Sequence, residues 1–434
     1  MENSVKDQVE AGTSLSSNGN AKSLIDFKNK FSWKQTFAAL NHSNYRLWFT
    51  GQVISLFGTW MQMSAQGFFI YELTHSPAFL GYVGFANGIP TWIFMAYAGV
   101  IADRFHRRRI LIVTQIMMMI LAFILAALTF THYVQPWHII VLTFFLGMAN
   151  AFDAPARQAF VNELVPREDL LNAIALNATM FHSALIFGPA AGGIIYAILG
   201  PGWCFTINGI SFIAVIYNLV RMKFDITHKK TVSKSNSKAF LEGLKYLKTQ
   251  KLILRIMLIV SSSTFLGMSL ITLFPAWAVN VLHGNAATNG WLQSARGIGA
   301  LICSLFIASF SKYIARGKVL ITGLIALPVF IILFSFSSTL LICIIILIGI
   351  GAATIATNNL SNGIIQTVVN EEFRGRIMGI YSFCFFSLMP IGALLVGTMA
   401  EHLGSQTAIL INGTILFVFA IGIWATSPEL RKIN

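Results

Sequence analysis

Asp153 and Arg157 are the residues of this sequence whose types and spacing point most directly to chemistry. They lie four positions apart within a long apolar segment, so on a helix their side chains share one face. An acid at the depth of a bilayer is costly and marks a functional candidate. Two hypotheses stay open: Asp153 exchanges protons or binds a cationic substrate, or the pair neutralises itself and shapes an inner gate.

His182 is a second candidate for proton coupling, because it lies midway along another apolar segment and histidine changes its charge near neutral pH. The alternative is an interior histidine whose hydrogen bonds are satisfied. The four cysteines and nine histidines show no metal-ligand spacing. No G-x-x-x-x-G-K-[ST] loop for a nucleotide occurs either. We therefore expect no metal, no disulfide, no cofactor and no enzyme activity.

Polar side chains recur at helical spacing in two further apolar segments. The first row is Gln52, Ser55, Thr59, Gln62 and Gln66, and the second is Thr354, Asn358, Asn362 and Gln366. A polar row in hydrocarbon needs a partner or water. Both rows are therefore expected to line a central cavity and to offer contacts to a substrate. Hydrogen bonds between packed helices are the alternative for the first row.

The elements that must position these residues are membrane helices. Only 11% of the 434 residues are charged, whereas a globular domain carries roughly 25%. Crossing the hydrocarbon takes about 20 mostly apolar residues. Twelve segments meet this requirement, near 45–72, 78–102, 110–131, 137–161, 171–199, 203–221, 252–281, 290–311, 318–336, 338–367, 374–400 and 406–426. The sequence predicts an all-α polytopic membrane protein with twelve transmembrane helices.

Lys and Arg fall almost entirely on one side of this arrangement. If the N-terminus is cytoplasmic, the connections at 73–77, 132–136, 200–202, 282–289, 337 and 401–405 face outward and carry no Lys or Arg. Of the 30 cations, only Arg296 lies toward the outer side. This is the positive-inside distribution. The net charge of +14 is thus a topology signal rather than a nucleic-acid surface, and both termini are expected in the cytoplasm.

Two halves of the chain repeat each other. Residues 207–212 read INGISF and residues 411–416 read INGTIL, while Asn150 and Gln158 correspond to Asn358 and Gln366 at a similar offset. Two parallel six-helix halves with a cavity between them are a known plan of transporters. The expected domains are a cytoplasmic tail with a candidate interfacial helix over 1–40, a first half over 41–222, a cytoplasmic central loop over 223–251, a second half over 252–426 and a cytoplasmic C-terminus over 427–434.

The segment AGVIADRFHRRRIL, residues 98–111, places one acid and four arginines between two apolar segments. Its residues Gly99, Asp103, Arg104, Arg107 and Arg108 follow the pattern G-x-x-x-D-R-x-x-R-R, which resembles the major facilitator superfamily loop between spans 2 and 3. The resemblance covers nearly everything after residue 40 and implies the major facilitator fold.

The position of this loop also predicts a role for it, independently of the resemblance. Asp103 ends its span near the start of the span that begins around Arg374, and a carboxylate beside a helix N-terminus is stabilised by roughly 0.3–1 kcal/mol. We expect the five loop residues to form a latch that bridges the halves when the inner side is closed. The arginines are expected to pair with Glu163, Glu168 or Asp169. The alternative is that the loop serves topology alone.

A more specific resemblance lies in AFDAPARQAFVNELVPREDLLNAIALN followed by GPAAGG at 188–193. This stretch is similar to the bacterial exporter branch that includes enterobactin and other siderophore exporters, with macrolide exporters nearby. Gly188, Pro189, Gly192 and Gly193 resemble the tail of a motif of proton-driven exporters. A small-residue ridge for close helix packing is the alternative.

The resemblance implies a secondary active transporter that works by alternating access. We expect a proton-coupled exporter of a small organic molecule, siderophore or drug-like, in the bacterial inner membrane. Its expected partners are the lipid bilayer, the substrate and protons, with no nucleic acid, and the expected state is a monomer. A proton-coupled importer of a siderophore or other nutrient is the alternative. A non-transporting membrane receptor is a third hypothesis.

Overall fold

The computed structural model describes residues 37–433 except 224–236 and 311–312, and this part of the chain consists of helices joined by short connections. The first six long helices are α3 (Ser43–Thr74), α4 (Pro77–Arg104), α5 (Arg107–Phe130), α6 (Pro136–Leu164), α7 (Leu170–Leu199) and α8 (Pro201–Arg221). After α9 (Ser237–Thr249), the remainder comprises α10 (Lys251–Ser262), α11 (Phe274–Asn280), α12 (Ala286–Phe310), α13 (Arg316–Ser335), α14 (Leu340–Val368), α15 (Glu371–Leu403) and α16 (Ser405–Thr426). Short helices at Ala38–Asn41 and Pro428–Arg431 flank these elements.

The expected all-α polytopic fold is confirmed. Ten helical segments are long and apolar enough to cross a membrane, and α3 and α4, of 32 and 28 residues, complete the twelve. Within the predicted central loop, residues 237–249 form α9, which packs on the start of α15 through the stacked rings of Tyr246 and Phe373, whose centroids are 4.3 Å apart. The candidate interfacial helix near residue 30 falls outside the described residues.

One predicted span is not a continuous helix. Between α10 and α11 the backbone passes through a π-turn, Ser263–Gly267, and a 3-10 turn, Met268–Leu273. Pro275 lacks an amide hydrogen and cannot continue the regular ladder back into the preceding turn, which accounts for a break on its N-terminal side. The span expected at 252–281 is present as Lys251–Asn280, but it consists of two helices joined by these turns.

The connections define two ends of the bundle, which we call the short-loop end and the basic end. At the short-loop end, proline opens α4, α6 and α8, where its missing amide hydrogen has no helical partner to lose. Left-handed backbone at His75, His132 and His283, and at Gly200 and Gly404, turns the chain there. The basic end holds the connections around 105–106, 165–169, 222–250, 311–315 and 369–370.

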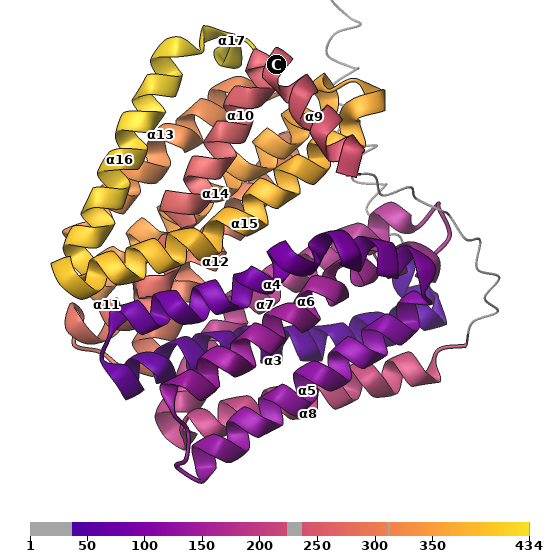
Figure 1. The fold of residues 1–434 in the computed structure, drawn as a ribbon, viewed down its shortest axis with the longest axis vertical. Coiled ribbons are helices and arrows are strands. Elements are labelled where there is room, and N and C mark those ends of the chain that lie inside the picture. Colours follow the sequence, from indigo (N-terminus) through magenta and orange to yellow (C-terminus); the bar gives the residue numbers. More distant parts are fainter. Residues whose placement is uncertain (1–36, 224–236, 311–312, 434) are drawn as a thin grey trace, which may run out of the picture.

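The twelve spans form two bundles, α3–α8 and α10–α16 (Figure 1). Two helix pairs make most of the contact between them: α4 packs along α15, and α7 packs along α12. In Figure 1 the bundles meet toward the short-loop end and diverge toward the end where α9 lies. The site residues are therefore carried by two bodies with a limited contact zone.

Candidate functional site

The Asp153 carboxylate lies in α6 with no exposed surface and is surrounded by donors. Its Oδ1 accepts hydrogen bonds from Thr114 Oγ1 at 2.9 Å and Gln115 Nε2 at 3.0 Å, both from α5. Its Oδ2 accepts from Arg157 Nε at 2.8 Å and from a second guanidinium nitrogen of the same residue. The structure thus brings the two predicted residues together as an ion pair, and α5 supplies the further donors.

Arg157 differs from its partner in exposure. Its side chain is 29% exposed, whereas that of Asp153 is fully buried. The carboxylate is therefore satisfied on both oxygens, and the cation is the member of the pair that reaches open space. A carboxylate and a guanidinium paired in this way are what the gate-shaping hypothesis expects, and that hypothesis stays a prediction.

The first polar row, on α3, makes its hydrogen bonds inside the first half. Asn208 Nδ2 of α8 donates to Gln62 Oε1 at 2.7 Å, and Gln66 Nε2 donates to Thr143 Oγ1 of α6 at 2.7 Å. Gln52 and Ser55 are buried, and Thr59 is half-buried. These contacts are the ones that the helix-packing alternative expects, so the row holds α3 against α6 and α8.

The second row, on α14, has a different environment at each end. Thr354 and Asn358 are buried, Asn362 is half-buried and Gln366 is exposed. Gln366 Nε2 donates to Asn362 Oδ1 near the basic end. The Oδ1 atom of Asn358 is buried without a hydrogen-bond partner among the described residues. This amide oxygen is available to a group that the chain itself does not provide.

The latch residues are described only in part. The side chains of Asp103 and Arg104 lie outside the described residues. Arg107 pairs with Glu163 of α6, and Arg108 Nη2 donates to the Val220 carbonyl of α8 at 2.8 Å. Both arginines thus anchor the loop to its own half. A Cβ on Gly99 would meet nothing within 4 Å, so no close packing explains this glycine.

The GPAAGG segment forms close helix contacts in two directions. A Cβ on Gly188 would lie 2.6 Å from Trp60 Cβ, and one on Gly192 would lie 2.7 Å from the Met61 carbonyl oxygen, both on α3. A Cβ on Gly193 would lie 2.5 Å from the Ala286 carbonyl oxygen of α12 in the other half. The ridge therefore packs helices, and its last residue helps to join the halves.

His182, the other coupling candidate, stands apart from Asp153. It lies midway along α7, half-buried, with its ring against that of Phe181. Its Nδ1 atom is buried and has no hydrogen-bond partner among the described residues. No described contact links it to the Asp153 network.

Hydrogen bonds between the halves, which the sequence did not predict, gather at the short-loop end. Glu401 Oε2 of α15 accepts from Ser76 Oγ at 2.6 Å and from the Ala78 amide at 3.2 Å, at the start of α4. Asn280 Nδ2 donates to Tyr71 Oη at 2.7 Å. Ser64 Oγ of α3 accepts from Asn289 Nδ2 at 3.2 Å and Gln293 Nε2 at 3.0 Å, both on α12. Among the described residues, no hydrogen bond joins the halves at the basic end.

Arg296 is a further candidate for the site, although its sequence position suggested only an exception in the distribution of cations. It lies on α12, three residues beyond Gln293, and its Nε atom is buried without a hydrogen-bond partner among the described residues. A signal for it was present in the sequence, because Arg296 is the one cation that departs from the positive-inside distribution.

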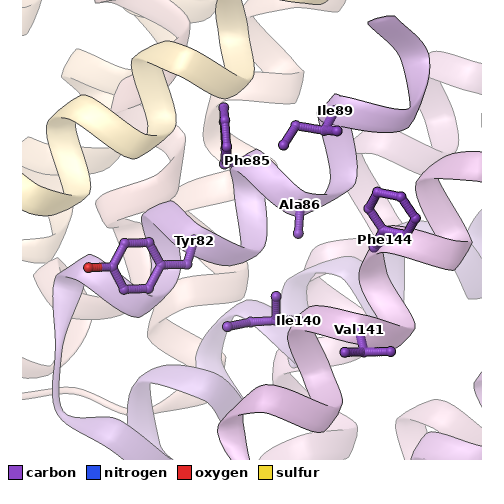
Figure 2. A pocket seen from close by; sticks show the side chains of 7 residues that line it. All are labelled: Tyr82, Phe85, Ala86, Ile89, Ile140, Val141 and Phe144. Carbon is purple, nitrogen blue, oxygen red and sulfur yellow. The ribbon is translucent and has the colours of Figure 1, made fainter. Parts of the chain in front are cut away.

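The pocket drawn in Figure 2 lies elsewhere, between α4 and α6. It measures about 470 Å³ and is lined by Tyr82, Phe85, Ala86, Ile89, Ile140, Val141 and Phe144. The Tyr82 hydroxyl points away from the other lining residues (Figure 2). A substrate site needs a few convergent polar groups, so we do not place the substrate there. Within the described part of the chain, no group of three His, Cys, Asp or Glu residues is arranged to hold a metal ion.

Comparison with known proteins identifies the group to which this architecture is similar. The family model for transmembrane secretion effectors matches residues 34–433. Macrolide efflux protein A of Streptococcus pyogenes is 21% identical over 406 residues, covering 93% of this chain and 98% of the relative. Enterobactin exporter EntS of Citrobacter koseri is 23% identical over 411 residues, covering 94% and 97%.

A solved structure shows the same fold. The crystal structure of the nucleoside transporter NupG superimposes with a TM-score of 0.70 at 15% identity, covering 89% of this chain and 99% of that one. At this identity the similarity concerns the arrangement of helices alone.

Proposed function

This chain belongs to the transmembrane secretion effector family of the major facilitator superfamily, and from that premise we propose that it exports a small organic molecule by alternating access with proton coupling. It is a multi-pass membrane transporter and not an enzyme. The proposed substrates are siderophores or drug-like molecules, in keeping with the names of its relatives. Import of a siderophore or other nutrient by the same fold is the second candidate.

The proposal of alternating access is supported by the uneven distribution of contacts between the halves. Glu401, Tyr71 and Ser64 all bond across the interface at the short-loop end. The described residues of the basic end bond within their own half instead, as Arg107 does with Glu163. Two helical bundles that are joined at one end can rock against each other about a central site, as alternating access requires.

We propose that the two ends use the same type of latch in turn. Helices α4 and α15 lie side by side and run in opposite directions, so each end of the pair places one helix C-terminus beside the other N-terminus. Glu401 supplies a carboxylate to the N-terminus of α4 at the short-loop end. Asp103, at the other end of α4, would supply one to the N-terminus of α15 when the basic end closes.

Neutralising Glu401 and neutralising Asp103 are expected to shift the equilibrium between the two conformations in opposite directions. A carboxylate at a helix N-terminus contributes about 0.3–2 kcal/mol, so Glu401→Gln should favour opening of the short-loop end by about twofold to thirtyfold. Asp103→Asn should favour the state closed at the short-loop end. Spin labels at Tyr133→Cys and Phe336→Cys, residues that are 74% and 71% exposed, report that opening by distance measurement in a background without native cysteines. Equal distance distributions in both variants and the parent would refute the latch at both ends.

The proposed orientation places the basic end and both termini in the cytoplasm of a bacterium and the chain in the inner membrane. The distribution of Lys and Arg supports this orientation. Labelling with an impermeant thiol reagent tests it, since in whole cells Tyr133→Cys should react and Tyr313→Cys should not.

Export is tested with inverted membrane vesicles, in which the cytoplasmic face is outside. We expect vesicles with an acidic lumen to accumulate at least one member of a panel of labelled siderophores and macrolides. A protonophore should abolish this accumulation, because the proton gradient supplies the energy. Vesicles from cells without the protein are the control. Accumulation only in right-side-out vesicles would favour import instead.

A further inference from the structure

Arg296 lies on the face of α12 that is turned toward the space between the halves. At 3.6 residues per turn, Arg296 is less than one turn from Gln293 and shares a face with Asn289, and both amides bond to Ser64 of α3. The opposite face of α12 carries exposed apolar side chains, Trp291, Ile298, Ile302 and Leu305, which suit lipid. Along α12, Arg296 therefore lies just beyond the closed short-loop contact, in the direction of the basic end.

This cation has no counter-ion within the described chain. Helices α10–α14 and α16 contain no Asp or Glu, and the acids of α15 lie at its ends. In the first half, Asp153 is bound by Arg157, and Glu72 accepts a hydrogen bond from Tyr196 at the short-loop end. Burying an unpaired charge at membrane depth is unfavourable unless a partner arrives. The membrane-embedded region around Arg296 is therefore net positive.

A second polar group without a partner lies on the neighbouring helix. A Cβ on Gly351 of α14 would lie 2.0 Å from the Arg296 carbonyl oxygen, so α12 and α14 approach closely at this level. Thr354 lies three residues after Gly351 on α14, and Asn358 lies seven residues after it, toward the basic end. The Asn358 Oδ1 atom is buried without a described partner, as is Arg296 Nε. The hydrogen-bonding capacity of this donor and this acceptor on adjacent helices thus remains open to a ligand.

We propose that Arg296 binds an anionic group of the transported molecule and that Asn358 accepts a hydrogen bond from a neighbouring hydroxyl or amide of it. This inference rests on the proposed function and deepens it, because it assigns the substrate to organic anions that bear carboxylate or catecholate oxygens. A guanidinium presents a planar fork of donors that matches two such oxygens. A substrate whose only charge is a cation would be repelled at this position.

Binding to the purified full-length protein tests the proposal without a known substrate. Citrate and 2,3-dihydroxybenzoate serve as probes, and thermal unfolding in detergent reports their binding. We expect both probes to raise the Tm of the parent protein. Arg296→Gln should weaken the binding at least tenfold, and Arg296→Lys, which keeps the charge without the fork, should give an intermediate value. Arg109→Gln is the matched control, since Arg109 is exposed at the basic end and should bind the probes as the parent does.

The Tm without any probe separates binding from a structural role. If Arg296 has no partner in the chain, Arg296→Gln should leave the unliganded Tm unchanged or raise it. A lower unliganded Tm together with unaltered probe binding would overturn the proposal, because it would reveal a structural ion pair. A second result would also overturn the proposal: the Arg296→Gln variant exports a basic or neutral drug at the parent rate, and the probes affect neither protein. That result would leave the proposed export function intact.

Discussion

Asp153→Asn is expected to lower thermal stability and substrate exchange together, and Asp153→Asn combined with Arg157→Gln is expected to recover part of both losses. The Asp153 carboxylate is fully buried and accepts hydrogen bonds from Thr114, Gln115 and Arg157. Removing one member of a buried pair costs about 3–5 kcal/mol. Because the Arg157 side chain is 29% exposed, the cost should fall toward the lower end of that range.

Thermal unfolding in detergent and counterflow exchange in proteoliposomes measure the two effects. Glu163→Gln is the control, because its pair with Arg107 is partly exposed and should contribute no more than about 1 kcal/mol. The competing hypothesis gives a different result. If Asp153 carries protons, the single variant should keep its stability and its exchange while substrate-driven proton movement disappears.

Gly290→Ala is expected to open the short-loop end. A Cβ at this position would lie 2.4 Å from the Pro189 carbonyl oxygen across the interface between the halves, and a backbone atom cannot move aside cheaply. Overpacking of this kind costs about 1–3 kcal/mol, and here only the state closed at the short-loop end bears the cost. The population of that state should therefore fall by about 5-fold to 150-fold relative to the open one.

The label pair at Tyr133→Cys and Phe336→Cys measures this shift as longer distances. A second pair at Phe105→Cys and Tyr313→Cys, on the exposed surface of the basic end, should show shorter ones. Gly379→Ala is the matched control, because a Cβ there meets nothing within 4 Å. Distances in Gly290→Ala that match those of the control at both ends would mean that the α7–α12 contact does not change during transport.

The twelve spans were predictable because each depends on a local property, an apolar run long enough for hydrocarbon. The broken helix between α10 and α11 was missed because composition does not reveal a π-turn. Spacing placed Asp153 and Arg157 on one face, and the structure pairs them. It did not reveal Thr114 and Gln115, which approach from another helix.

The rows of polar residues show where helical periodicity stops being informative. It places Gln62 and Gln66 on one face of α3 but does not say which helix that face meets, and their partners are Asn208 and Thr143 in the same half. Glu401 went unnoticed for a related reason. An acid near a loop looks ordinary until the N-terminus of α4 is placed beside it.

The two glycines that turn the chain into α8 and α16 preserve a trace of how the protein arose. Gly200 and Gly404 stand at equivalent places in the two halves, with φ of 89° and 81°, a backbone conformation that other residues adopt only with strain. A tandem duplication of one six-helix gene would have copied this turn, and both descendants still need it. The loop sequence ADRFHRRRIL at 102–111 corresponds to SKYIARGKVL at 311–320, where Lys312 stands in the place of Asp103. The glycine turn is thus common to both halves, whereas the acid of the 98–111 loop belongs to the first half alone.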